Sequence, residues 1–194
     1  NSNGGEFDLR EDAVSVAKAL GYDADNYDHV IFAYQGGPGN FQGLASMADK
    51  FVWLKLIDVG TAAHELGHNF GLWHANSWET DGQSIIGPGT NLEYGNSFDW
   101  MGGSRSANGD FNACWKNRIG WLRDEFTYQI RESGAYRIFA LDQPGLDPAR
   151  PRAFVVNRDR ERSYWGEYRQ RFDPANPSLQ NGLLLNWSPW SQSG

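Results

Sequence analysis

Apolar residues recur at helical spacing in three segments of the chain. Between residues 9 and 20 they fall on one face, and Gly21 follows where a helix stop is expected. A longer helix is expected over residues 59–72, with Asp58 as its N-cap, because an aspartate side chain can accept a hydrogen bond from the first helical turn. A short third helix is expected over residues 111–119. The pattern therefore predicts few helices.

Most of the remaining apolar residues lie in short runs rich in β-branched and aromatic side chains, which are typical of strands. These runs are interrupted by residues 75–109, where Gly, Asn, Ser, Asp and Pro dominate and predict a long, exposed loop region. The expected strands are residues 29–34, 43–47 and 50–56 before this region, and residues 135–141, 152–157, 163–169 and 182–187 after it.

This order of elements predicts an α+β fold. The simplest division is an α+β region over residues 1–123, followed by a small all-β region over residues 124–194. Four strands make a thin module, so we expect the second region either to pack on the first or to continue beyond Gly194. The chain begins without an initiator Met or a signal sequence, so we expect it to be a piece of a longer protein.

Composition narrows the class of protein. A chain of 194 residues that is 40% hydrophobic can bury a core without disulfides, and its single cysteine, Cys114, excludes an internal one. Residues 51–57 form the best apolar stretch, far short of the roughly 20 residues of a membrane span. The net charge of −7 argues against nucleic-acid binding, which relies on basic patches. We therefore expect neither a membrane span nor a nucleic-acid partner, and the oligomeric state stays open.

The strongest chemical signal lies in residues 64–74, which read H-E-L-G-H-N-F-G-L-W-H. This segment matches the pattern H-E-x-x-H-x-x-G-x-x-H at every specified position. A chance match is on the order of 10⁻⁵ per chain when positions are treated as independent. Ordinary surface histidines are therefore a poor explanation of the segment.

The spacing suits one zinc ion. On a helix, His64 and His68 project from one face, so both imidazoles can bind the same ion. Gly71 can adopt a positive φ, end the helix and turn the chain, which would bring His74 round as the third ligand. Glu65 is rotated by about 100° from His64 and can lie beside the ion without binding it. Three protein ligands leave a position for water, which is typical of a catalytic zinc site.

The predicted reaction is hydrolysis of a peptide bond. Zinc lowers the pKa of a bound water to about 7 and polarises a substrate carbonyl. Glu65 would take the proton of that water as general base and later deliver it to the leaving amine. The sequence thus predicts a zinc-dependent endopeptidase.

The extended motif resembles that of the metzincin clan of zinc endopeptidases. These enzymes carry a Met-turn downstream, and Asp99-Trp100-Met101-Gly102 is similar to it, although Met101 could also be ordinary core filling. Within the clan, the stretches at residues 63–69, 93–102, 116–122 and 164–169 resemble the gametolysin-like peptidases.

The resemblance implies a metzincin-like zincin domain, a mixed sheet with the zinc-binding helix at the floor of a cleft. It also implies a secreted or cell-surface protein with protein or glycoprotein substrates bound in extended conformation. In metzincins an edge strand before the zinc helix pairs with substrate. Residues 43–47 and 50–56 are both candidates for that strand.

Two positions depart from subgroups of the clan. Astacin-like and serralysin-like members have a zinc-binding Tyr two residues after the Met, where this chain has Gly103. The residue after the third histidine is Ala75, which fits none of the astacin, matrixin, serralysin or reprolysin labels.

Several alternatives remain open at this stage. A non-catalytic metzincin-fold module that binds a protein or glycan would suit the nine Trp residues, although the retained Glu65 argues against it. Cys114 is expected to be a small buried residue, and His29 a turn or strand-end residue without a role. A calcium site is a further hypothesis, since carboxylates suit that ion, and the alternative is a solvated loop surface. The acidic residues concerned are Glu79, Asp81, Glu93 and Asp99.

Overall fold

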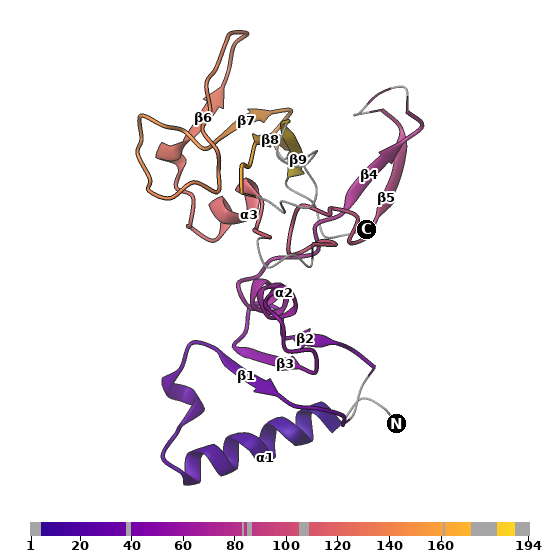
Figure 1. The fold of residues 1–194 in the computed structure, drawn as a ribbon, viewed down its shortest axis with the longest axis vertical. Coiled ribbons are helices and arrows are strands. Elements are labelled where there is room, and N and C mark those ends of the chain that lie inside the picture. The colour runs from indigo at the N-terminus through magenta and orange to yellow at the C-terminus, as the bar shows by residue number, and fades with distance from the viewer. Residues whose placement is uncertain are drawn as a thin grey trace. The chain divides into compact units, whose positions relative to one another are not determined.

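The structure is a computed structural model of the chain, and it describes residues 5–37, 40–82, 84, 87–104, 109–160, 162–171 and 182–188. Its described part contains a few helices and three small sheets, so the α+β prediction is confirmed (Figure 1). The chain divides into two compact units. Unit 1 comprises residues 1–96 and 100–107, and unit 2 comprises residues 97–99 and 108–194.

Unit 1 is built on a three-stranded sheet in the order β1-β3-β2. Strand β3 pairs in parallel with β1 and antiparallel with β2, so β3 is the central strand and β2 is an edge. The elements of this part are α1 (Gly5–Ala19), the 3-10 turn η1 (Ala24–Asn26), β1 (Val30–Ala33), β2 (Gly43–Ala45), β3 (Phe51–Leu54) and α2 (Val59–Asn69). The strands predicted in this half are confirmed, with shorter bounds.

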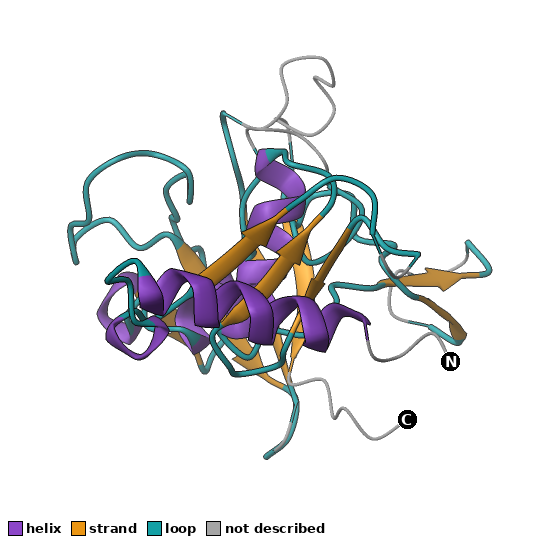
Figure 2. Ribbon diagram, turned by 90° about the horizontal axis from the view of Figure 1, so that it is seen from below, coloured by secondary structure: helices purple, strands orange, loops and turns teal. Residues whose placement is uncertain are grey.

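The alternation of side chains along β3 explains why a helix lies on each face of this sheet. Trp53 packs edge-on against Phe7 of α1, and the Arg10 guanidinium lies 5.2 Å from the centre of the Phe51 ring. The intervening Val52, which is fully buried, points to the opposite face. Helix α2 contacts β2 and β3, and Figure 2 shows α1 crossing the strands. The sheet thus supports α2 from one side.

Both long helices differ from their predicted bounds. Helix α1 spans Gly5–Ala19 rather than residues 9–20. Its first turn contains Glu6 and Asp8, which favour a helix N-terminus but do not extend the apolar periodicity. Helix α2 ends at Asn69 rather than at residue 72, because Gly71 adopts a left-handed conformation.

A β-hairpin lies inside the segment predicted to be irregular. Strand β4 (Ser77–Thr80) pairs antiparallel with β5 (Gly89–Leu92), so that prediction is wrong for these residues. The sequence pattern does not predict β4 and β5, because most of their side chains are exposed and show no apolar alternation. Backbone pairing and the close approach of Gly89 to the Glu79 carbonyl define the hairpin instead.

Unit 2 contains a four-stranded sheet in the order β6-β7-β8-β9. Strand β6 pairs in parallel with β7, and the other two pairs are antiparallel. Its elements are α3 (Ala113–Arg118), the 3-10 turn η2 (Asp124–Phe126), β6 (Thr127–Ile130), β7 (Ala153–Asn157), β8 (Ser163–Glu167) and β9 (Leu184–Ser188). Three of the four strands predicted for this half are confirmed.

The fourth, residues 135–141, is not a strand, and β6 was not predicted. That segment forms no continuous ladder: its backbone bonds run from the Phe139 N–H to the Pro151 carbonyl at 2.8 Å and from the Leu141 N–H to the Tyr168 carbonyl at 2.9 Å, and the Arg152 guanidinium donates to the Ala140 carbonyl. Apolar composition without a continuous ladder does not make a strand.

The core of unit 2 explains why the units divide near residues 96–108 rather than at residue 123. Helix α3 belongs with the sheet, because its buried residues share one hydrophobic cluster with the strands, and buried Cys114 lies in it as predicted. The cluster comprises Ala113, Cys114, Leu122, Phe126, Leu141, Ala153, Val155 and Trp165. None of the helices in the described part of the chain has the length and apolar character needed to cross a membrane.

Candidate metal centre

Helix α2 carries two of the three motif histidines. Its N-terminus is capped by Asp58, whose side chain accepts hydrogen bonds of 2.9 Å from both the backbone N–H and the hydroxyl of Thr61. The predicted cap is thus confirmed. His64 and His68 follow one turn apart on the same face of α2, and their ring centroids are 4.8 Å apart.

The end of α2 brings the third histidine to the other two. Gly71 has a φ of +82°, and its N–H donates to the carbonyl of His68 at 2.9 Å. The turn returns the chain toward the helix, and the His74 ring lies 5.5 Å from that of His64 and 5.1 Å from that of His68. The predicted role of Gly71 in turning the chain is confirmed.

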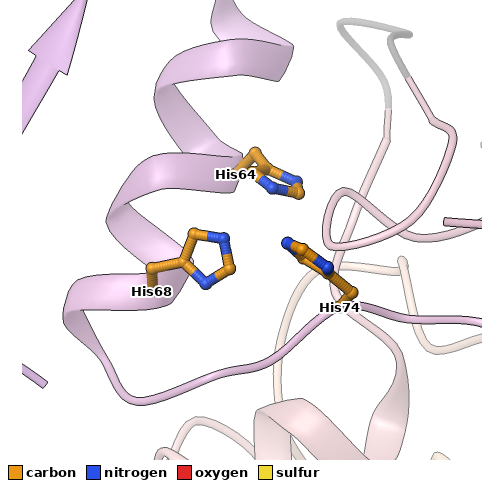
Figure 3. A group of neighbouring side chains, drawn as sticks. All are labelled: His64, His68 and His74. Carbon is orange, nitrogen blue, oxygen red and sulfur yellow. The ribbon is translucent and has the colours of Figure 1, made fainter. Parts of the chain in front are cut away.

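The three rings face one another around a shared space (Figure 3). One ring nitrogen from each of His64, His68 and His74 lies within 4.8 Å of the others. A tetrahedral ion with bonds of 2.0–2.1 Å holds its ligand nitrogens about 3.4 Å apart, so small side-chain rotations fit this group around one ion. Imidazoles suit zinc, copper, iron and nickel. Among the described residues, this is the one group of three or more ligating side chains placed to hold a metal.

Hydrogen bonds orient each of the three rings. The Nδ1 atom of His64 lies 2.7 Å from the Trp100 carbonyl oxygen, and that of His68 lies 2.8 Å from the Leu72 carbonyl oxygen. The Nδ1 atom of His74 lies 2.7 Å from Oε1 of Glu93. These oxygens only accept, so each Nδ1 carries the proton and donates it. The tautomer that results leaves each Nε2 lone pair available to a metal.

The lowered pKa of His68 also favours metal binding. Burial lowers the pKa of His68, and the neighbouring His74 lowers it further, whereas the hydrogen bond to the Leu72 carbonyl acts in the opposite direction. A lowered pKa favours the neutral imidazole, which is the form that binds metals.

Glu65 lies on the helix between the two histidines and is buried, with 6% of its surface exposed. Its side chain lies directly against β2, because a Cβ added to Gly43 would stand 2.5 Å from Oε1 and 2.6 Å from Cγ of Glu65. The glycine backbone therefore leaves the space that this carboxylate side chain occupies.

The predicted Met-turn lies next to two of the histidines. Met101 is fully buried, and its carbonyl accepts a 2.8 Å hydrogen bond from the N–H of Ala75, the residue after His74. The preceding residue, Trp100, supplies the carbonyl acceptor of His64. Two neighbouring carbonyls, those of Trp100 and Met101, thus bind the helix at His64 and the loop that carries His74.

Two of the four acidic residues considered for calcium have contacts of their own. Glu93 bonds to His74, and Asp99 belongs to unit 2, where its carboxylate accepts the N–H of Asn112 at 2.8 Å. In the described parts of the chain, no group of three or more ligating side chains includes any of the four. The hypothesis of a calcium site at these residues therefore finds no support among the described residues.

The sequence does not predict the partners of the histidines. Trp100 and Glu93 both lie in the segment 93–102 that carries the family resemblance, where Trp100 belongs to the expected Met-turn and Glu93 is a calcium candidate. No local signal marks a carbonyl acceptor, because the pairing depends on folding rather than on residue type. His29 does have a structural partner, since its Nδ1 lies 3.1 Å from the Oδ1 of Asn69 on α2.

No family model, curated protein or solved structure matches this chain.

Proposed function

We propose that this protein is a zinc-dependent endopeptidase with a metzincin-like catalytic domain, acting on extracellular proteins. The observation that carries the proposal is the convergence of His64, His68 and His74, each with its Nδ1 proton directed to an acceptor, beside the buried Glu65. A set of three protein ligands is typical of catalytic zinc sites, which keep a further position open.

Each residue of the site has a separate task. Zinc, when bound, supplies a Lewis acid and makes a bound water acidic near neutral pH. His64, His68 and His74 hold the ion through their Nε2 atoms. The Glu65 carboxylate accepts the proton of the attacking water and returns it to the nitrogen of the leaving amine. Met101 provides an apolar support behind the ligands in this proposal, in keeping with its complete burial.

Strand β2 is the proposed place for an extended substrate. Strand β3 is excluded because it has β1 on one side and β2 on the other. In the described part of unit 1, the far edge of β2 pairs with no strand, and β2 also carries Gly43, which touches the Glu65 side chain. Main-chain pairing along such an edge binds protein or glycoprotein chains with little side-chain preference.

The test compares the wild-type chain with Glu65→Gln, which preserves the size of the side chain. We expect one zinc per chain in both, and cleavage of an unfolded protein substrate only by the wild type. The loss in kcat should be at least about 10²-fold, as for removal of a general base. One zinc in both with no cleavage by either would favour a non-catalytic binding module. A wild-type chain that takes up no zinc would refute the proposal.

A further inference from the structure

His74 differs from the other two histidines in how it is held. His64 and His68 project from a helix and donate to backbone carbonyls. His74 lies in the irregular segment after the helix, its side chain is 21% exposed, and its Nδ1 donates to a side-chain carboxylate, that of Glu93. His74 is thus the one of the three candidate ligands that lies outside a helix or strand, and its hydrogen-bond partner is the charged carboxylate of Glu93.

The next residue covers the ring of His74. The Tyr94 ring lies 3.9 Å from the His74 ring, centroid to centroid, with an angle of 36° between their planes, and 5.8 Å from the His64 ring. Tyr94 and Glu93 directly follow β5, so one hairpin end supplies both contacts. Contact on one face and a hydrogen bond at one edge together restrict rotation of the imidazole.

The backbone at Tyr94 indicates that this arrangement is specified. Tyr94 has a φ of +60°, which is uncommon for a large side chain, and its N–H donates to the Oδ1 of Asn76 at 3.1 Å. The following Gly95 allows close packing, since an added Cβ would lie 2.1 Å from the Ser77 hydroxyl oxygen. Gly95 thus stands where the backbone packs closely against β4. Tyr94 adopts an uncommon backbone conformation at the position where its ring covers His74.

We propose that Glu93 and Tyr94 form a clamp that holds His74 in its metal-binding orientation and so determines how tightly the three histidines retain their metal. The proposal rests on the proposed zinc site. The Glu93 carboxylate keeps the proton on Nδ1 of His74, which leaves Nε2 as the donor atom and makes the imidazole a stronger ligand. Tyr94 acts through its ring, which slows the departure of His74 from the ion.

The experiment measures zinc affinity by competition with a chromogenic chelator, and the dissociation rate by transfer of zinc to an excess of chelator. Glu93→Gln removes the charge at the clamp, and Glu79→Gln removes the same charge on β4 of the same hairpin as a matched control. We expect Glu93→Gln to weaken zinc binding by about 10-fold or more, within the range typical of such partners. Glu79→Gln should leave the affinity within about two-fold, since the hydrogen-bond acceptor of His74 is Glu93.

The ring is tested by Tyr94→Leu and Tyr94→Phe. We expect Tyr94→Leu to accelerate zinc release by about two- to ten-fold, the range typical of an aromatic pair, while Tyr94→Phe, which keeps the ring, matches the wild type. In the zinc-loaded protein, Glu93→Ala should remove the slowly exchanging Nδ1–H proton resonance of His74 and leave those of His64 and His68. A merely structural role would not produce that selective loss.

The outcomes separate this inference from the proposed function. If the wild type binds zinc and cleaves protein while Glu93→Gln binds zinc equally well, the clamp is refuted and the peptidase stands. If the wild type binds zinc without cleaving, the affinity series still decides the clamp. If the wild type binds no zinc, both proposals fall. Thermal unfolding of each metal-free variant, expected to match the wild type, identifies any loss of affinity that comes from misfolding.

Discussion

Gly43 offers a direct test of the packing around Glu65. A Cβ at this position would lie 2.5–2.8 Å from three atoms of the Glu65 side chain, where ordinary contacts begin at 3.4 Å. Gly43 lies in β2 and its φ is outside the left-handed region, so alanine meets no backbone strain there. A loss of stability or of activity in Gly43→Ala would therefore come from the steric contact with the carboxylate side chain.

Two magnitudes follow from this geometry. Relief of the overlap requires the Glu65 side chain to move by about 1 Å, and a displacement of that size in a catalytic group can reduce the rate by about 10²-fold. Overpacking at a buried contact costs about 1–3 kcal/mol. Alanine recovers about 0.4–1 kcal/mol by restricting the unfolded chain, so the net loss of unfolding free energy lies between about 0 and 2.6 kcal/mol.

The assay is a double-mutant cycle in which Gly43→Ala is made in the wild type and in Glu65→Ala. In the wild-type background we expect the loss of stability, the loss of kcat and an unchanged zinc content. In the Glu65→Ala background the overlapping atoms are gone, so the same substitution should be neutral or stabilising by up to about 1 kcal/mol. Equal destabilisation in both backgrounds would refute the steric reasoning, and full activity of Gly43→Ala would show that Glu65 does not depend on this space.

Two further predictions concern unit 2. Burial raises the pKa of the Cys114 thiol, so the folded protein should react with iodoacetamide at pH 8 far more slowly than the unfolded chain, as mass spectrometry would measure. Because the unfolded thiol ionises near pH 8.5 and the folded one at higher pH, the unfolding free energy should fall as the pH rises above about 8.5, and Cys114→Ala should lessen that fall. Arg169→Met leaves the buried Glu167 carboxylate without its guanidinium partner at 2.6 Å, which should destabilise the fold by about 3–5 kcal/mol in urea unfolding. A loss below about 1 kcal/mol would show that this pair is solvated.

Local rules explain what could be predicted from the sequence. Side chains at positions i and i+4 of a helix share a face, so the spacing of His64 and His68 by itself places both rings together. Asp58 and Gly71 act within a few residues of themselves, as an N-cap and as a left-handed helix end, and both were predicted. The candidate metal ligands were therefore encoded in one continuous segment.

The surroundings of those ligands depended on tertiary structure. Trp100 and Glu93, the partners of His64 and His74, stand 36 and 19 residues away along the chain, and neither residue type marks itself as an acceptor. The order of the first sheet likewise decided that β2, rather than β3, has a free edge within the described residues of unit 1. Periodicity reports which face of an element is buried, but it does not report which element covers that face. The sequence by itself thus determined which atoms could bind a metal, whereas only the folded chain decided how those atoms are oriented, because the orienting contacts join segments that are distant in sequence.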